Sequence, residues 1–533
     1  MSSAWQCSGC DKATYMVSHS FLRRLCVASL FMLPLVATAS TTEHHRFLHL
    51  QAGELVRGVW EGPYSASLDV IDPLLRTRNL KSDNYEKDDF VWLAPETGVY
   101  QLRSSGLTND YGPSLQRVVA PPVKEHKPTA AYTELSSPTL QRLQQQLQDG
   151  GDTSAFWQWV EQQTTPLVEP YSDTHKRVSF LWRGEHRNVR LFGGPATEPV
   201  WMRRLTHSDV WFATFILANA AEFSYQIAPD VPTVEQLGAR ANRRLVLATA
   251  QADPYNPRRF GAGSGATSDS FSYSSVLRLE QAPARLAFEE HKLTGKLSVH
   301  RLPSRILNNE RDIALYRSAS TSTERQLLVL LDMGPYLSRV KAPQLLSYLE
   351  KIGCLPATDV VMVANPSAQT RTQELPPNPD FADFIVNEVL PFAAAQGISA
   401  PASRRIIAGS SFGGLASTYV AQRYPEEIPN VISLSGSYWW APADEDPEWT
   451  ARQLQQHEAL PVQFFLSAGE YEGGLPGRPN LLDSNKRLLQ VLQQKGYAVH
   501  FEHYYGGHDY YSWQRLLANG LLHFHLQAEQ CAS

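Results

Sequence analysis

From about residue 295 onward, the chain alternates short apolar runs with longer amphipathic stretches. The apolar runs are typical of strands buried on both faces, and the amphipathic stretches are typical of helices that cover a sheet. The alternation therefore predicts an α/β domain at residues 295–533 with a mostly parallel sheet. The predicted strands are 296–302, 312–316, 326–331, 360–363, 406–408, 431–434, 462–466 and 499–504, and the predicted helices are 343–352, 380–395, 413–424, 483–494 and 511–524.

The chain before residue 295 shows a different pattern, in which apolar and polar positions alternate with a period of two. Gly, Pro and Asn-Asp clusters separate these runs, so they predict short strands joined by turns. A series of such strands over about 100 residues suits an immunoglobulin-like β-sandwich. The predicted parts are a β-rich, sandwich-like domain at 40–125, a linker with short helices (139–147 and 154–163) at 126–174, and an immunoglobulin-like β-sandwich at 175–294. Residues 253–275 predict a surface loop, with a mobile lid as the alternative.

The first 39 residues have the pattern of a secretory signal peptide. Arg23 and Arg24 precede an apolar run at 25–36, and an Ala-Thr-Ala cleavage signal ends at Ala39. Residues 1–15 then represent an over-long start, with Met16 as the initiator. The run is too short to span a bilayer, so we expect a periplasmic or secreted protein without stable membrane insertion once the signal is removed. A retained anchor is the alternative.

The amino-acid composition argues against a nucleic-acid-binding protein. The charged fraction of the 533 residues is 19%, the net charge is −5, and no dense Lys/Arg run occurs, so nucleic acid is not an expected partner. Three of the five cysteines precede the cleavage site. Cys354 and Cys531 remain, either joined as a disulfide or as two buried thiols. Scattered histidines lack ligand spacing, so we expect no metal site and no cofactor.

The run Gly409-Ser-Ser411-Phe-Gly413 carries the clearest chemical signal. It fits G-x-S-x-G and lies between a predicted strand and a predicted helix rich in small residues. That context is typical of a nucleophile elbow, in which a sharp turn exposes the serine hydroxyl above the sheet of an α/β hydrolase. We therefore predict Ser411 as the nucleophile.

A serine nucleophile needs a base oriented by an acid, and in this fold the chain order is serine, acid, histidine. His508 lies in a Gly-rich loop between the last predicted strand and the last helix, and we predict it as the base. Glu472 follows the strand 462–466 and is the first choice for the acid, with Glu470 and Asp483 as alternatives.

The tetrahedral intermediate of ester hydrolysis needs two backbone N–H donors. One is expected from Phe412, directly after the nucleophile. The other is expected from the loop after the strand 326–331, where Pro335 has no N–H, which leaves Met333 or Gly334. We predict Phe412 and Gly334.

Several runs of the sequence form a recognisable set. They are Gly409-Ser-Ser-Phe-Gly-Gly-Leu-Ala-Ser, Ser435-Gly-Ser-Tyr-Trp-Trp440, Gly506-Gly-His-Asp509, Arg371-Thr-Gln-Glu-Leu375 with Asn378-Pro-Asp-Phe381, Phe180-Leu-Trp-Arg183, Asp209-Val-Trp211 and Asp253-Pro-Tyr-Asn-Pro257. Together these runs resemble the enterochelin (enterobactin) esterase family, in the esterase D branch of α/β hydrolases. The resemblance covers roughly residues 175–533, and residues 41 to about 125 fall outside it. A methionine, Met333, interrupts the Asp-Gly pair that is usual in the family.

The resemblance implies a substrate, a ferric tris-catecholate siderophore built on a cyclic triserine lactone. Its serine esters suit an acyl-enzyme route, and opening the lactone would help to release iron. Tyr438, Trp439 and Trp440 are predicted to offer aromatic faces to the catechol arms, and Arg371 is predicted to offer positive charge. Glu472 also matches the family's acidic residue after Ala-Gly.

Two other functions fit the same sequence. One is a secreted carboxylesterase that acts on acetylated or feruloylated polysaccharide. The other is a binding protein with a degenerate hydrolase domain.

The signal-peptide prediction is tested by sequencing the amino terminus of the mature protein from a bacterial host. We expect it to begin at Ser40, because cleavage follows Ala39. A mature terminus well upstream of Ser40 would contradict the prediction.

Overall fold

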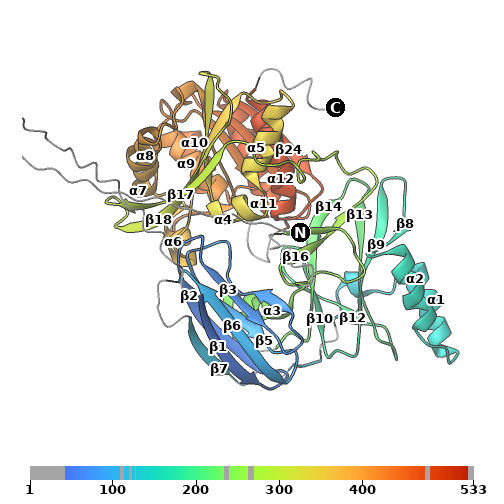
Figure 1. Cartoon of the computed structure of the whole chain (residues 1–533). Coiled ribbons are helices and arrows are strands. Elements are labelled where there is room, and N and C mark those ends of the chain that lie inside the picture. Colours follow the sequence, from blue (N-terminus) through green and yellow to red (C-terminus); the bar gives the residue numbers. More distant parts are fainter. Residues whose placement is uncertain are drawn as a thin grey trace, which may run out of the picture. The chain divides into compact units, whose positions relative to one another are not determined.

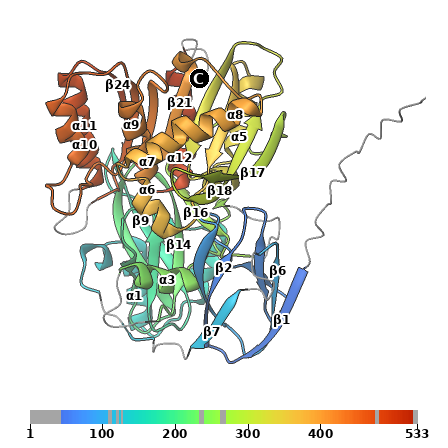
Figure 2. The same cartoon turned by 90° about the vertical axis from the view of Figure 1, so that its left-hand side faces the viewer.

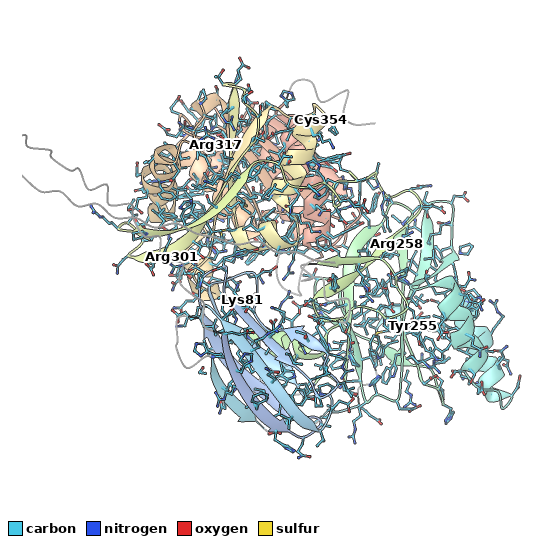
Figure 3. All side chains as sticks on the ribbon, in the orientation of Figure 1. Lys81, Tyr255, Arg258, Arg301, Arg317 and Cys354 are labelled. Carbon is cyan, nitrogen blue, oxygen red and sulfur yellow. The ribbon has the colours of Figure 1, made fainter. Side chains whose placement is uncertain are left out.

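The computed structural model describes residues 43–107, 113–118, 123–125, 128–232, 239–261, 269–473 and 480–525. The predicted signal peptide, its initiator Met16 and Cys531 therefore lie outside the described residues. Cys354 is disulfide-bonded (labelled in Figure 3), with a partner outside the described residues, so its pairing with Cys531 stays a prediction. Within the described ranges, no helix has the length and apolar character needed to cross a membrane.

The α/β part is built on an eight-stranded sheet with the order β17-β18-β20-β19-β21-β22-β23-β24 (Figure 1). The hairpin β17-β18 and the β18-β20 pair are antiparallel, and every pair from β20 to β24 is parallel. This confirms the predicted α/β class and a mostly parallel sheet. The strands are β17 (Lys296–Ser304), β18 (Asn309–Arg317), β19 (Arg325–Leu331), β20 (Ala357–Val363), β21 (Arg405–Ser410), β22 (Asn430–Leu434), β23 (Gln463–Gly469) and β24 (Ala498–Tyr504).

Helices cover both faces of this sheet. Successive residues of a strand point to opposite faces, so one strand can contribute side chains to both cores. In β19, Leu327 and Val329 join one core while Leu328 and Leu330 join the other. Helices α7 to α11 pack on the first core, and α4, α5 and α12 pack on the second (Figures 1 and 2). The helices are α4 (Met333–Ser338), α5 (Ala342–Lys351), α6 (Ala368–Glu374), α7 (Pro379–Phe384), α8 (Leu390–Ala395), α9 (Phe412–Arg423), α10 (Trp449–Gln456), α11 (Leu481–Gln494) and α12 (Tyr510–His523).

Most predicted helices are confirmed, with local differences. The predicted helix 380–395 contains a π-helical turn at Ile385–Val389. This turn precedes Pro391, which has no N–H to donate and crowds the carbonyl four residues earlier. The short helices α4, α6 and α10 were not predicted, because six to eight residues carry too little periodicity to be recognised.

The strands found between residues 167 and 278 form two facing antiparallel sheets, with the orders β12-β13-β9-β8 and β11-β10-β14-β16-β15. Phe180, Trp211, Phe223 and Tyr225 are buried between them. The β-sandwich is confirmed, and its immunoglobulin type stays a prediction. Part of the predicted loop 253–275 is strand, because β15 pairs with β16. The elements are β8 (Leu167–Pro170), β9 (His175–Arg183), β10 (Val189–Gly193), β11 (Val200–Trp201), β12 (Arg203–Arg204), β13 (Val210–Ala218), β14 (Glu222–Pro229), α3 (Ala239–Thr249), β15 (Arg259–Gly261) and β16 (Tyr273–Arg278).

The amino-terminal described residues are β-rich, as predicted. Two sheets, β1-β6-β3-β4 and β5-β2-β7, enclose a core that includes Trp60, Trp92 and Tyr100. The strands are β1 (Glu43–Leu50), β2 (Leu55–Glu61), β3 (Ser67–Ile71), β4 (Thr77–Asn79), β5 (Lys87–Leu93), β6 (Gly98–Ser105) and β7 (Ser114–Val118). Helices α1 (Pro138–Gln148) and α2 (Ser154–Gln163) follow and confirm the two predicted short helices.

A buried ion pair beside the sheet provides a test of this packing. Arg311 of β18, whose side chain is 0% exposed, donates to both carboxylate oxygens of Glu374 at 2.9 Å. We expect Glu374→Ala to lower the free energy of unfolding by about 3–5 kcal/mol, because it leaves a buried guanidinium without its counter-charge. The matched control is Glu324→Ala, which breaks an exposed pair with Arg404 and should cost at most about 1 kcal/mol. Denaturant unfolding measures both, and equal losses would contradict the prediction.

Candidate active site

Ser411 occupies a sharp turn between β21 and α9. Its φ of 58° and ψ of −122° are strained for a residue with a side chain. The neighbouring glycines make the turn possible: a β-carbon at Gly409 would lie 2.5 Å from the backbone of Gly413. One at Gly414 would lie 2.5 Å from Ser433 Oγ. The predicted strand, turn and helix are therefore present, with the serine at the carboxyl edge of the sheet.

Glu472 and His508 are hydrogen-bonded to each other at the same edge. His508 Nδ1 lies 2.9 Å from Glu472 Oε1. The Glu472 side chain is 1% exposed, and it also accepts from Tyr504 OH at 3.1 Å and from the Gly469 N–H at 2.9 Å. An ionised carboxylate only accepts, so His508 Nδ1 carries the proton in this bond, which leaves Nε2 as the basic nitrogen.

The other candidate acids have different partners. Glu470 is largely exposed and bonds to His503 Nε2 at 2.8 Å. Asp483 is exposed in the first turn of α11, whose N-cap is Asn480. Asp509, which directly follows His508, caps α12 by accepting from the Ser512 N–H. The geometry thus brings Glu472, and not its alternatives, to His508.

Ser437 is a polar neighbour of the nucleophile that the sequence did not reveal. Its Oγ lies 3.2 Å from Ser411 Oγ, and its N–H donates to the Ser411 carbonyl. Ser411, Ser437, Glu472 and His508 follow the adjacent strands β21, β22, β23 and β24 in that order. Parallel strands place their carboxyl ends at one edge, so these four distant segments reach the same edge of the sheet.

Tyr504 and Trp513 link the acid–base pair to the strand beside the nucleophile. The Tyr504 and Ser435 hydroxyls are 2.9 Å apart, and Trp513 Nε1 donates to Ser435 Oγ. Burial and the nearby Glu472 carboxylate raise the pKa of Tyr504 well above its usual value, so its hydroxyl stays protonated and donates to Glu472. The ring of Trp513 meets the imidazole of His508 edge-on at 4.8 Å.

The predicted oxyanion donors lie at two adjoining helix starts. Phe412 is the first residue of α9, and Met333 and Gly334 are the first two of α4. First-turn N–H groups have no acceptor within their own helix. The two starts meet because β19 pairs with β21, and a β-carbon on Gly413 would lie 3.1 Å from Asp332 Oδ2. The donor roles of Phe412 and Gly334 stay predictions.

The Arg371 side chain forms an ion pair with the carboxylate of Asp332, within the protein itself. Its Nε and Nη2 donate to Asp332 at 2.7 and 2.9 Å, and Asn365 Nδ2 donates to the same carboxylate at 2.6 Å. Burial lowers the pKa of Arg371, but the Asp332 charge and hydrogen bonds outweigh burial and raise it. Arg371 thus holds the left-handed turn at Asp332, where φ is 61°, and a further role in binding a ligand stays a prediction.

The three aromatic residues that we predicted to face the catechol arms differ in their exposure. Tyr438 is 0% exposed, and its hydroxyl bonds to Ser433 and Thr418 beneath the elbow, so its prediction as a ligand-binding residue is wrong. Trp440 is partly buried and packs edge-on against Trp449. Trp439 is partly buried to a similar degree, and its ring lies 6.0 Å from that of Phe412, the residue after the nucleophile.

The β-sandwich holds both loops that carry the acid and the base. Ser224 of β14 donates through its N–H and its Oγ to Asp509, the residue after His508. Tyr471, the residue before Glu472, packs edge-on against Phe223 and accepts from the Ala218 N–H. No sequence signal marked these contacts, because each is one ordinary polar or aromatic residue.

Two further features lie outside this arrangement. A hollow on the β-sandwich, lined by Trp182, Arg183 and Tyr255 among others, contains none of the predicted site residues (Tyr255 is labelled in Figure 3). Among the residues that the structure describes, no cluster of His, Cys, Asp and Glu is arranged to hold a metal ion.

The sheet, the strained serine turn and the hydrogen-bonded Glu472–His508 pair define the class as a carboxylic ester hydrolase of the α/β-hydrolase type. Residues 304–524 match the family model described as putative esterase, and residues 177–288 match enterochelin esterase, N-terminal. These two matches together support a relationship to the enterochelin esterase family.

Similar proteins support this placement over most of their own length. The iron(III) enterobactin esterase of Escherichia coli K12 is 29% identical over 396 residues, which span 71% of this chain and 92% of that protein. The crystal structure of the enterobactin esterase from Shigella flexneri in the presence of enterobactin is 27% identical, covers 69% of this chain and 97% of its own, and has a TM-score of 0.56. The ferric enterobactin esterase from Salmonella typhimurium is 25% identical with a TM-score of 0.58.

The pairing of Glu472 with His508 predicts a specific defect. Glu472→Gln keeps the side chain's shape but loses the charge that orients and stabilises a protonated His508, so kcat should fall by about 10²- to 10⁴-fold. The matched control is Glu470→Gln, which alters the neighbouring exposed acid and should stay near the wild-type rate. Steady-state hydrolysis of a p-nitrophenyl ester measures both, and the reverse order of defects would contradict the pairing.

Proposed function

We propose that this protein hydrolyses the serine ester bonds of a ferric catecholate siderophore trilactone through an acyl-enzyme, and so aids iron release. The observation that carries the proposal is the Ser411 turn with the Glu472–His508 pair, in a chain similar to iron(III) enterobactin esterases over 92% of their length. The action is placed in the periplasm or outside the cell, on the strength of the predicted signal peptide.

In the first half-reaction, Ser411 Oγ attacks the ester carbonyl while His508 Nε2 takes the hydroxyl proton. The Glu472 carboxylate stabilises the resulting imidazolium through Nδ1. The negative oxygen of the tetrahedral intermediate faces the N–H of Phe412 and that of Met333 or Gly334. The intermediate collapses when the serine hydroxyl of the lactone leaves with the proton from His508, and Ser411 is left acylated.

In the second half-reaction, water takes the place of the leaving hydroxyl. His508 removes a proton from this water as it attacks the acyl carbonyl, and then returns a proton to Ser411 Oγ. The lactone is opened to a linear chain with a free carboxylate. The iron travels as part of the substrate, so the reaction needs no metal site of the protein.

Binding of the substrate draws on the partly exposed aromatic surface beside the elbow. Trp439 offers a ring face to a catechol arm, next to Phe412. The charge of Arg371 is largely compensated by Asp332, so its attraction for an anionic ligand is weaker than an unpaired arginine would provide.

The nucleophile is tested with Ser411→Ala. Removing Oγ removes the attacking atom, and we expect turnover of a p-nitrophenyl ester and of the siderophore to fall to background while the thermal unfolding midpoint is kept. Ser322→Ala, at an exposed loop serine, is the matched control and should act at the wild-type rate. Unchanged turnover by the Ser411→Ala protein would sink the esterase mechanism and favour a binding protein.

The substrate class is tested by chromatography of ferric enterobactin digests, with the Ser411→Ala protein as the control. We expect linear dihydroxybenzoyl-serine fragments from the wild type alone. If the lactone stays intact while the p-nitrophenyl ester is cleaved, the siderophore assignment fails. Release of acetate or ferulate from polysaccharide would then identify the alternative esterase.

A further inference from the structure

The amino-terminal β-domain, strands β1 to β7, is additional to the similar proteins. Both family models leave residues 1–176 unmatched. The solved Shigella flexneri enzyme is 97% covered by only 69% of this chain. One loop of this domain, residues 82–86 between β4 and β5, contacts the esterase part directly, and we call it the docking loop.

Asp83 of the docking loop binds the segment that follows β19. Its carboxylate accepts from Arg339 Nε at 2.8 Å, from Arg339 Nη2 at 2.6 Å and from Ser338 Oγ at 2.5 Å. Burial raises the pKa of Asp83, but the Arg339 charge, the hydrogen bonds from Arg339 and Ser338 and the Lys81 charge together outweigh burial and lower it. Ser338 and Arg339 close the helix α4, whose first residues hold the candidate oxyanion donors.

The backbone of Asp83 reaches the same helix. A β-carbon on Gly334 would lie 1.6 Å from the Asp83 carbonyl oxygen. Real side chains do not tolerate that separation, so the close approach depends on glycine at this position. The docking loop therefore touches the residue that we predict as the second oxyanion donor.

Glu86 connects the docking loop to the other side of the turn. Its N–H donates to the Asn365 carbonyl at 3.2 Å, and Asn365 Nδ2 donates to Asp332 at 2.6 Å. Its carboxylate accepts from the Asp312 N–H at 2.6 Å and from Arg301 at 2.5 Å. Figure 3 labels Arg301 and Lys81, which flank this contact from the two domains. Glu86 thus contacts Asn365, which in turn binds the Asp332 carboxylate. Asp83 binds the end of the helix that follows Asp332.

We propose that the docking loop is a positioning element of the esterase site, in which Asp83 and Glu86 hold residues 332–339 in the conformation that serves the oxyanion. The amino-terminal domain then sets the rate of the chemical step without touching substrate. This inference rests on the proposed function, because it assigns a catalytic use to the turn at Asp332. It predicts a kcat defect from changes in a domain that the similar enzymes lack.

The test is a charge swap across the contact. Asp83→Arg places two like charges together and should lower kcat by about 10- to 100-fold with little change in KM, because the oxyanion donors shift while substrate contacts remain. Arg339→Asp in the same chain restores an opposite pair and should recover most of the loss. The matched control is Asp72→Arg, which disrupts the Asp72–Arg76 ion pair inside the same domain and should leave kcat unchanged.

Rates are expressed per serine that reacts with a fluorophosphonate probe, so that misfolded protein does not count. If kcat per reactive serine is the same in Asp83→Arg and Asp72→Arg, or if the swap with Arg339→Asp recovers nothing, the inference is overturned. Its failure is distinguishable from that of the proposed function. An active Ser411→Ala protein would refute the esterase mechanism, whereas an inactive one with a fully active Asp83→Arg protein would refute only the positioning role.

Discussion

The left-handed, strained backbone of Ser411 is the constraint on which the site depends. The chain must leave a strand, turn sharply and begin a helix within one residue. The turn brings neighbouring backbone segments very close together, which only small residues allow. Gly409 and Gly414 provide that space. The Ser411 N–H donates to the Leu434 carbonyl, and the Ser411 carbonyl accepts from the Ser437 N–H, so the adjacent strand holds the strained turn in place. The cost of the strain is offset by the packed sheet around it.

Two buried carboxylates organise the two halves of the candidate site. Glu472 lies beside the candidate base, where His508, Tyr504 and a backbone N–H satisfy it. Asp332 lies beside the predicted oxyanion donors, where Arg371 and Asn365 satisfy it. A buried charge is tolerated only when it is paired or fully hydrogen-bonded, so each carboxylate draws in residues from several segments. The need to satisfy these charges is what makes the surrounding loops adopt one arrangement.

The β-domains extend this arrangement beyond the sheet. The β-sandwich holds the loops of the acid and the base through Ser224 and Phe223, on the side of β23 and β24. The amino-terminal β-domain contacts the opposite half of the site, at the segment after β19 and the loop after β20. Loops are the least stable parts of an α/β fold, and docking against another domain is a direct way to reduce their freedom.

Local pattern alone determined the strands, most helices and the serine turn, because strand periodicity and a G-x-S-x-G run are properties of neighbouring residues. The pattern also identified His508 as the candidate base and limited the candidates for the acid to three residues. Only the tertiary structure distinguished Glu472 from Glu470. The loop after β23 directs the two side chains to different partners, so that Glu472 bonds to His508 and Glu470 does not. Burial likewise removed Tyr438 from the ligand surface. The contacts of Asp83 were invisible in the sequence, because they join residues more than 250 positions apart through packing that no local pattern records.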